Sequence, residues 1–203
     1  MLFRSDIITK LVDMGDLRRA KRAANKLAAF YQNSLADGSE VLSLAKEIQL
    51  IENYMAIQNI RYGDAFHLNL HIDSQLSALL IPKLTLQPLV ENAIYHGLKL
   101  VDRPGEIGIM ATEDDEKYMI HLWDNGLGLT EDRIIRINDE LHLTLAQREA
   151  AYLNEDDIAI GFGLSSVAER LKLYYGPGTR LAVESRTPNE GLQITIHIPK
   201  EAL

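Results

Sequence analysis

The sequence Leu84-Thr-Leu-Gln-Pro-Leu-Val-Glu-Asn-Ala-Ile-Tyr-His-Gly97 decides how the rest of the chain is interpreted. Its apolar residues recur at intervals of three and four, which predicts an amphipathic helix of three turns. Thr85 is the expected N-cap, Pro88 suits the first turn, and Gly97 is expected to end the helix in a left-handed conformation. Asn92 follows Pro88 by one turn on the same face. Taken alone, this stretch predicts a helix and no function.

Two glycine-containing motifs follow this helix. Asp124-Asn-Gly-Leu-Gly128 comes after an apolar strand pattern, and Gly161-Phe-Gly-Leu164 opens another helix. Each motif alone is typical of a turn. In this order and at these spacings, the three motifs resemble the N, G1 and G2 boxes of the GHKL ATP-binding fold, which sensor histidine kinases share with gyrase and MutL. The resemblance covers roughly residues 62 to 199.

The segment upstream is similar to the helices of the LytS/YesM-like branch of sensor histidine kinases. The similarity lies in residues 26–35 (KLAAFYQNSL) and 54–62 (YMAIQNIRY). In that branch a histidine-bearing box of the Pro-His-Phe-Leu type lies just before this segment, and no such box occurs in the sequence. The histidines present all lie in or after the predicted nucleotide domain: His67, His71, His96, His121, His142 and His197. We therefore expect a fragment without the phosphoacceptor histidine.

Composition limits the class of protein. The chain has 203 residues, enough for one or two domains with a core. Lys and Arg number 21 against 29 Asp and Glu, a net charge of −8, so binding of nucleic acid is not expected. The absence of cysteine excludes disulfides and thiolate metal sites. With no apolar run long enough to span a membrane, we expect a cytoplasmic location, and any membrane attachment only through missing N-terminal segments.

The periodicity predicts an α+β fold in two parts. Residues 1–62 read as a helical hairpin, with Asp16 and Ser43 as helix caps. The hairpin would be a dimerisation and phosphotransfer remnant; it either packs on its own domain or forms half of a dimeric four-helix bundle. Residues 63–203 would form the ATP-binding catalytic domain, a two-layer α/β sandwich of GHKL type with a mixed sheet. The long connection at about 127–162 is expected to be a lid.

The residues in the three motifs suit a nucleotide site. Asp124 can accept a hydrogen bond from the 6-amino group of adenine, and Asn92 offers an uncharged oxygen to Mg²⁺. The resemblance implies these two roles as well. It also implies that Glu91 orients solvent or metal beside Asn92, which makes Glu91 and Asn92 the catalytic candidates. His96 could contact phosphate when protonated. The residues expected to frame the base and the lid are Gly126, Gly128, Gly161, Gly163 and Leu164.

Two positions depart from the pattern of relatives. Tyr95 stands where relatives often have Lys, which weakens the expected contact with phosphate. ATPase members carry a Glu four residues before the Mg²⁺-binding Asn, and here Pro88 occupies that place and cannot act as a base. Hydrolysis of ATP is therefore disfavoured, whereas transfer to a neutral imidazole, itself a nucleophile, remains feasible.

The resemblance thus implies the catalytic portion of a sensor protein-histidine kinase with ATP and Mg²⁺ as cofactors. It would transfer the γ-phosphoryl group to a histidine upstream of this fragment, so the fragment alone would not phosphorylate itself. The full-length protein would be a homodimer, and the receiver domain of a response regulator would be its partner. The alternative is a non-catalytic nucleotide-sensing or dimerisation module, and Tyr95 is its best support.

Overall fold

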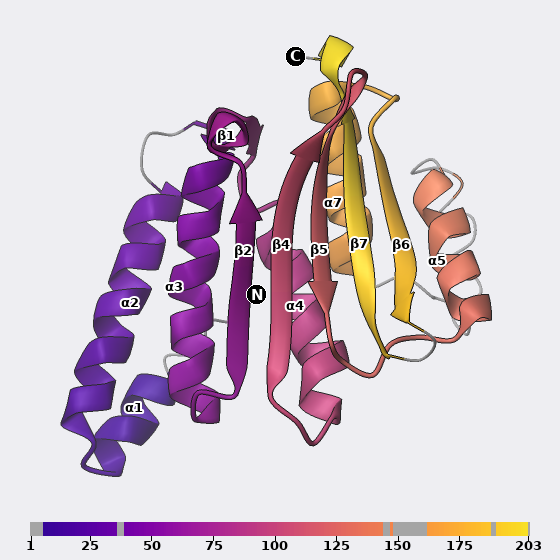
Figure 1. Cartoon of the computed structure of the whole chain (residues 1–203). Helices are drawn as coiled ribbons and strands as arrows, with labels where there is room; N and C mark the ends of the chain where they lie inside the picture. The colour runs from indigo at the N-terminus through magenta and orange to yellow at the C-terminus, as the bar shows by residue number, and fades with distance from the viewer. Residues whose placement is uncertain (1–5, 36–38, 144–146, 148–161, 188–189, 203) are drawn as a thin grey trace.

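A mixed five-stranded sheet forms the centre of the molecule (Figure 1). The computed structural model describes residues 6–35, 39–143, 147, 162–187 and 190–202. The strands run in the order β2-β4-β5-β7-β6, with β2 parallel to β4 and the other neighbours antiparallel. Their bounds are β2 Phe66–Ile72, β4 Gly105–Glu113, β5 Lys117–Asp124, β6 Arg180–Thr187 and β7 Glu190–Pro199. The predicted mixed sheet is confirmed.

Helices cover one face of this sheet. The short helix α4 (Gln87–Asn92) and the helix α7 (Phe162–Tyr175) lie behind the strands in Figure 1, and α5 (Glu131–His142) lies beside β6. The strands turn their most apolar side chains toward the helices, including the fully buried Ile107, Ile109, Ile120 and Leu122. The expected two-layer sandwich is confirmed, because the apolar face of the sheet packs against helices.

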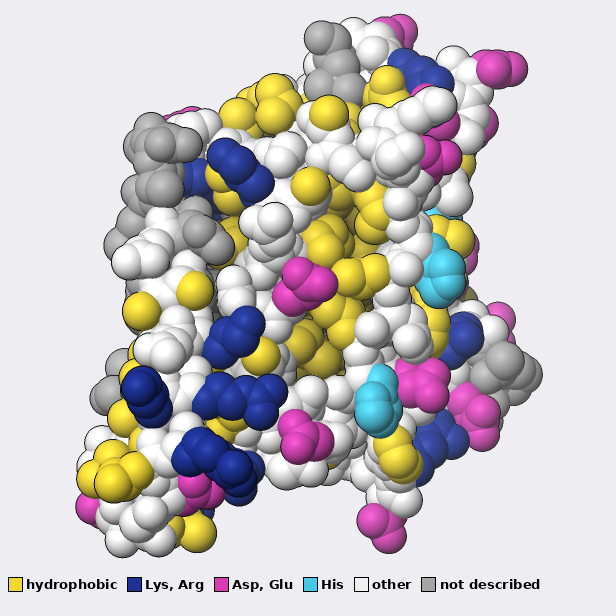
Figure 2. Space-filling model, turned by 60° about the vertical axis from the view of Figure 1, so that its left-hand side comes forward, with side chains coloured by type: hydrophobic (Ala, Val, Ile, Leu, Met, Phe, Trp, Pro, Cys, Tyr) yellow, Lys and Arg dark blue, Asp and Glu magenta, His cyan; other side chains and the backbone are white. Residues whose placement is uncertain are grey.

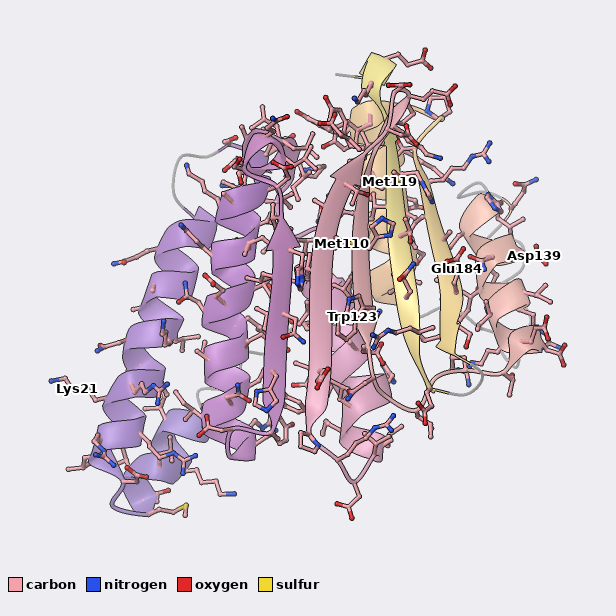
Figure 3. The ribbon with its side chains drawn as sticks, viewed as in Figure 1. Lys21, Met110, Met119, Trp123, Asp139 and Glu184 are labelled. Carbon is pink, nitrogen blue, oxygen red and sulfur yellow. The ribbon has the colours of Figure 1, made fainter. Side chains whose placement is uncertain are left out.

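The opposite face of the sheet carries Met110, Met119 and Trp123, which Figure 3 shows in front of the strands. Gly108 leaves room for the indole of Trp123, since a Cβ at residue 108 would lie 1.9 Å from the Trp123 ring. The Arg186 guanidinium stacks 3.8 Å from the centroid of the same ring. This face is therefore amphipathic, unlike the apolar face under the helices.

An asparagine side chain pairs with one backbone residue at each edge of the sheet. At the β2 edge, Asn59 donates from Nδ2 to the Phe66 carbonyl (2.8 Å) and accepts from the Phe66 N–H at Oδ1 (2.9 Å). At the β6 edge, Asn138 donates to the Val183 carbonyl (2.7 Å) and accepts from the Val183 N–H (2.8 Å). Each amide pairs with both backbone groups of one edge residue, so that residue is not available to pair with another chain.

The N-terminal part consists of α1 (Asp6–Asp13), α2 (Leu17–Leu35) and α3 (Leu44–Tyr62). Both predicted caps are confirmed: Asp16 Oδ1 accepts from the Arg19 N–H (3.0 Å), and Ser43 Oγ accepts from the Lys46 N–H (3.4 Å). Figure 2 shows basic side chains gathered over the lower part of this region. None of the helices that the structure describes combines the length and apolarity needed to cross a membrane.

Helix α3 shares the core of the sheet domain. Its buried residues Leu44, Ile51 and Tyr54 belong to the same cluster as the sheet side chains, whereas α1 and α2 contribute to a small separate cluster with Ile60. A three-residue ladder, β1 (Val41–Ser43) against β3 (Leu80–Pro82), also ties the start of α3 to the segment before α4. The domain boundary at residue 62 stays a prediction, and the main core extends across it.

Candidate functional site

The helix that contains Asn92 begins differently from the sequence prediction. The predicted N-cap role of Thr85 is wrong, because its hydroxyl donates to the Pro82 carbonyl (2.6 Å) and the cap position belongs to Leu86, which makes no side-chain cap. The carboxylate of Glu47, from α3, accepts from the backbone N–H groups of Leu84 (2.7 Å) and Leu86 (3.2 Å) instead. A residue 37 to 39 positions away therefore supplies the acceptor that was expected locally.

This helix also ends differently. After α4 the chain continues through a π-helical turn, η2 (Ala93–Gly97), and a 3₁₀ turn, η3 (Leu98–Leu100). The predicted left-handed stop at Gly97 is wrong, because its φ is −106°. Space at this residue is limited, since a Cβ would lie 3.1 Å from Oδ1 of Asp124. Single π-helical turns are frequent at functional sites.

Asp124 lies at the end of β5 against this helix. Its side chain is only 5% exposed, and Oδ1 accepts from the Gly126 N–H (2.7 Å). A Cβ at Gly126 would lie 2.6 Å from the Gly97 backbone. Gly126 is thus required by close packing against Gly97, whereas Gly128 adopts a left-handed φ of 72°. The structure brings the Asp124 motif into direct contact with the end of the helix that carries Asn92.

Burial controls the electrostatics of Asp124. It raises the pKa of this carboxyl to about 6, although hydrogen bonds from the Gly126 and Leu192 N–H groups and the charge of Arg186 act in the opposite direction. A buried carboxylate that lacks sufficient donors is costly. An additional neutral donor, such as an exocyclic amine, would stabilise the ionised form of Asp124.

Asn92 faces the start of α7. A Cβ at Gly163 would lie 3.7 Å from Asn92 Nδ2 and 3.6 Å from Pro88 Cβ. Leu164, the next residue, is buried in the core and anchors this first turn of α7. The Asn92 motif therefore contacts the second glycine motif on one side and the Asp124 motif on the other. Gly161, and residues 144–146 and 148–161 of the lid predicted at about 127–162, lie outside the described residues.

The neighbouring side chains on this helix differ in their contacts and exposure. Glu91 Oε1 accepts from Gln87 Nε2 (2.7 Å). The Tyr95 hydroxyl is hydrogen-bonded to the buried hydroxyl of Tyr54 on α3, and burial raises the pKa of Tyr54 well above its ordinary range, with Glu91 and Tyr95 adding to the effect. His96 is exposed. Tyr95 therefore links the helix to α3.

Sequence reasoning missed two residues that shape this site. Gly191 has a φ of +72°, and a Cβ there would lie 2.0 Å from the Asp124 carbonyl oxygen. Asn125, directly after β5, holds the backbone at the start of β4. Its Oδ1 accepts from the Glu106 N–H (2.7 Å), and its Nδ2 donates to the Pro104 carbonyl (3.1 Å). Their sequence signals, a glycine and an asparagine in turn-like contexts, gave no indication of a role at the site.

Family comparisons match both parts of the chain. Residues 6–66 match the histidine kinase model. Residues 81–202 match the model of the histidine kinase-, DNA gyrase B-, and HSP90-like ATPases. The fold agrees: the catalytic domain of histidine kinase ThkA superposes with a TM-score of 0.53 at 19% identity, covering 80% of this chain and 97% of that domain.

Curated relatives are sensor proteins. LytS of Staphylococcus haemolyticus is 28% identical over 189 residues, covering 93% of this chain and 30% of LytS. The sensor histidine kinase YesM of Bacillus subtilis is 29% identical over 192 residues, covering 95% of this chain and 30% of YesM. The chain thus spans about 30% of the length of these relatives. Because the ATPase model matches more than half of its length, the chain belongs to the family of histidine kinase-, DNA gyrase B-, and HSP90-like ATPases.

Proposed function

We propose that this chain is the ATP-binding catalytic portion of a sensor protein-histidine kinase, which transfers the γ-phosphoryl group of ATP to a histidine upstream of residue 1. The observation that carries the proposal is the convergence of three motifs on one helix: Asn92 faces Gly163, and one turn later Gly97 contacts Asp124 and Gly126. Membership of the ATPase family implies nucleotide binding. The specific residue roles are our proposals.

Asp124 would recognise adenine. Its buried carboxylate can accept a hydrogen bond from the 6-amino group, whereas guanine presents an acceptor at that position. Because burial raises the pKa of Asp124 to about 6, an amine donor would recover part of the lost solvation. Gly126, Gly128 and Gly163 would frame the base and the start of the lid, with Gly161 beyond the described residues.

Asn92 would bind Mg²⁺. The described residues contain no group of three His, Asp or Glu side chains that could hold a metal ion. A cation at Asn92 would therefore take an amide oxygen, water and the phosphates of the nucleotide, which suits Mg²⁺. Glu91 would orient solvent next to Asn92, and His96, exposed one turn beyond Asn92, would meet phosphate when protonated.

The packing around Pro88 favours transfer over hydrolysis. Pro88 lies against Gly163, and it occupies the position, four residues before Asn92, at which the resemblance implies a water-activating Glu in ATPase members. The nearby carboxylate of Glu91 is engaged by Gln87. Transfer to a neutral imidazole requires positioning and charge stabilisation but no general base.

The full-length protein would act as a homodimer through its N-terminal helices, in the cytoplasm, with membrane attachment only through upstream segments. It would pass the phosphoryl group to a response regulator receiver domain. The second candidate function, a nucleotide-sensing or dimerisation module without transfer, is favoured by Tyr95, whose hydroxyl is engaged with Tyr54 and which supplies no cation.

Calorimetric titration tests the nucleotide site. ADP, ATP and GTP are titrated with and without Mg²⁺ into the wild type, Asp124→Ala and Asn92→Ala, with Asn69→Ala on β2 as a matched control. We expect adenine-selective binding that Asp124→Ala abolishes, whose Mg²⁺ dependence Asn92→Ala removes and Asn69→Ala leaves unchanged. Absence of binding by the wild type would refute the proposal.

Transfer requires the missing acceptor. A chain extended upstream by a segment with a histidine box is incubated with γ-labelled ATP. Acid-labile, base-stable label on histidine would support the kinase. Nucleotide binding without label would support the sensing module, and steady release of phosphate by the fragment alone would indicate a hydrolase.

A further inference from the structure

Glu47 is a buried carboxylate with no part in the nucleotide chemistry described above. It lies on α3 and is 0% exposed. Its two oxygens accept from different backbone N–H groups, Oε1 from Leu84 (2.7 Å) and Oε2 from Leu86 (3.2 Å). Burial raises the pKa of Glu47, whereas these hydrogen bonds and the charge of Arg170 oppose that shift. A fully buried acidic side chain carries a large desolvation cost, so its position calls for a compensating role.

The backbone that Glu47 holds is strained. Leu84 has a φ of +58°, one of two non-glycine residues with positive φ among those described. Such a conformation is costly for a leucine and persists only where the surroundings impose it. On the other side of the same residue, Arg170 of α7 donates from Nη2 to the Leu84 carbonyl (2.8 Å). We call Glu47, Leu84 and Arg170 the clasp.

The clasp fixes the relation between α4 and α7. Helix α7 runs along the segment from Leu80 to Asn92 with three spaced contacts. Tyr175 donates to the Leu80 carbonyl, Arg170 donates to the Leu84 carbonyl, and Gly163 faces Asn92. The middle contact is the one that Glu47 completes. A change in the Leu84 backbone would therefore shift α4 along α7 and alter the separation between Asn92 and Gly163.

We propose that Glu47 is a positioning residue of the nucleotide site: it holds Leu84 in its left-handed conformation and thereby sets Asn92 against Gly163. This inference rests on the proposed function, because it assigns Glu47 to the same nucleotide site. It also makes α3, the last of the N-terminal helices, a part of the catalytic unit. Glutamine cannot replace Glu47 in this role. Its Nε2 is a donor, and it would face a backbone N–H group that is also a donor.

The test compares ADP affinity, with and without Mg²⁺, among variants that are folded at the temperature of the titration. Glu47→Gln should weaken Mg²⁺-dependent binding of ADP by about tenfold. Glu52→Gln, at an exposed carboxylate on the same helix, is the matched control and should leave affinity unchanged. A role limited to global stability would not change the affinity of a folded variant.

A rescue variant tests whether Glu47 acts on the nucleotide site through the backbone conformation of Leu84. Leu84→Gly removes the cost of the positive φ, so Glu47→Gln/Leu84→Gly should recover most of the lost affinity. Asp64→Gly, at the other described residue with positive φ, is the control and should recover none. Unchanged affinity in Glu47→Gln, or equal loss in the double variant, would overturn the inference.

Hydrogen exchange on the wild type covers the case in which Glu47→Gln does not fold. Coupling between two sites is reciprocal, so ADP with Mg²⁺ must slow exchange of the Leu84 and Leu86 amides if the clasp supports binding. Unaltered exchange at both amides would overturn the inference. Failure of the wild type to bind ADP is a separate result, and it would overturn the proposed function together with the clasp.

Discussion

Asp124→Asn should stabilise the fold at neutral pH while it abolishes recognition of adenine. Asp124 is 5% exposed, and burial raises its pKa from an ordinary value of 3.8 to about 6. The folded protein therefore holds a proton on Asp124 in a pH range where the unfolded chain has lost it. The free energy of unfolding must then fall as the pH rises through this range. Asparagine removes this titration and keeps an oxygen that accepts from the Gly126 N–H.

The magnitude follows from the shift in pKa. Each pKa unit corresponds to about 1.4 kcal/mol. The shift in the pKa of Asp124 therefore amounts to about 3 kcal/mol of unfolding free energy when the titration is complete. Between about pH 4 and pH 7, the stability of Asp124→Asn relative to the wild type should rise by about 2 to 3 kcal/mol. His121 and His197, whose pKa values burial lowers, make both proteins lose stability as the pH falls. Their contribution cancels in the difference between the two proteins.

The assay is urea unfolding of the wild type and Asp124→Asn at several pH values over this range, followed by titration with ADP. We expect the two stability curves to converge near pH 4 and to diverge as the pH rises, with binding lost in the variant at every pH. A constant offset between the curves would refute the reasoning. It would mean that the Asp124 carboxyl titrates alike in the folded and unfolded chain.

Three further predictions follow from the packing. Gly126→Ala should lower the free energy of unfolding by about 2 to 4 kcal/mol, measured with urea, because the new Cβ would overlap the backbone of Gly97. Gly163→Ala is the control: its Cβ would make only ordinary contacts, so the free energy of unfolding should change by less than about 1 kcal/mol. Tyr95→Lys should destabilise the fold by about 1 to 2 kcal/mol, since it leaves the buried Tyr54 hydroxyl without this partner; an equal melting temperature in the variant and the wild type would contradict this. Asn138→Ala should cost about 1 to 3 kcal/mol in thermal unfolding, and faster hydrogen exchange should be confined to β6.

Local features of the sequence were predicted well. The caps at Asp16 and Ser43 were confirmed because each bonds a backbone N–H three residues further along the chain. The apolar strand pattern predicted before Asp124 corresponds to β5 (Lys117–Asp124), and the predicted mixed sheet is present. The short strands β1 and β3 were not expected, because three residues carry no measurable periodicity.

Predictions failed where a distant segment replaced a local one. Thr85 looked like a cap, but Glu47 approaches from α3 and accepts from the backbone N–H groups next to it. Gly97 looked like a helix stop, but the helix continues, and Asp124 and Gly126 pack closely against this glycine. The sequence shows a threonine and a glycine at these positions, and it does not distinguish a local role in the helix from a contact with a distant segment.

The sequence by itself determined the family, most of the long helices and the three motifs, because residue type and spacing encode these locally. The tertiary structure alone decided what the motifs touch. It brought Asn92 to Gly163 and Asp124 to Gly97, and it engaged Tyr95 with α3. It also placed a buried carboxylate, Glu47, under a strained leucine. Such contacts depend on how helices and strands far apart in the chain pack together, and no local pattern records that packing.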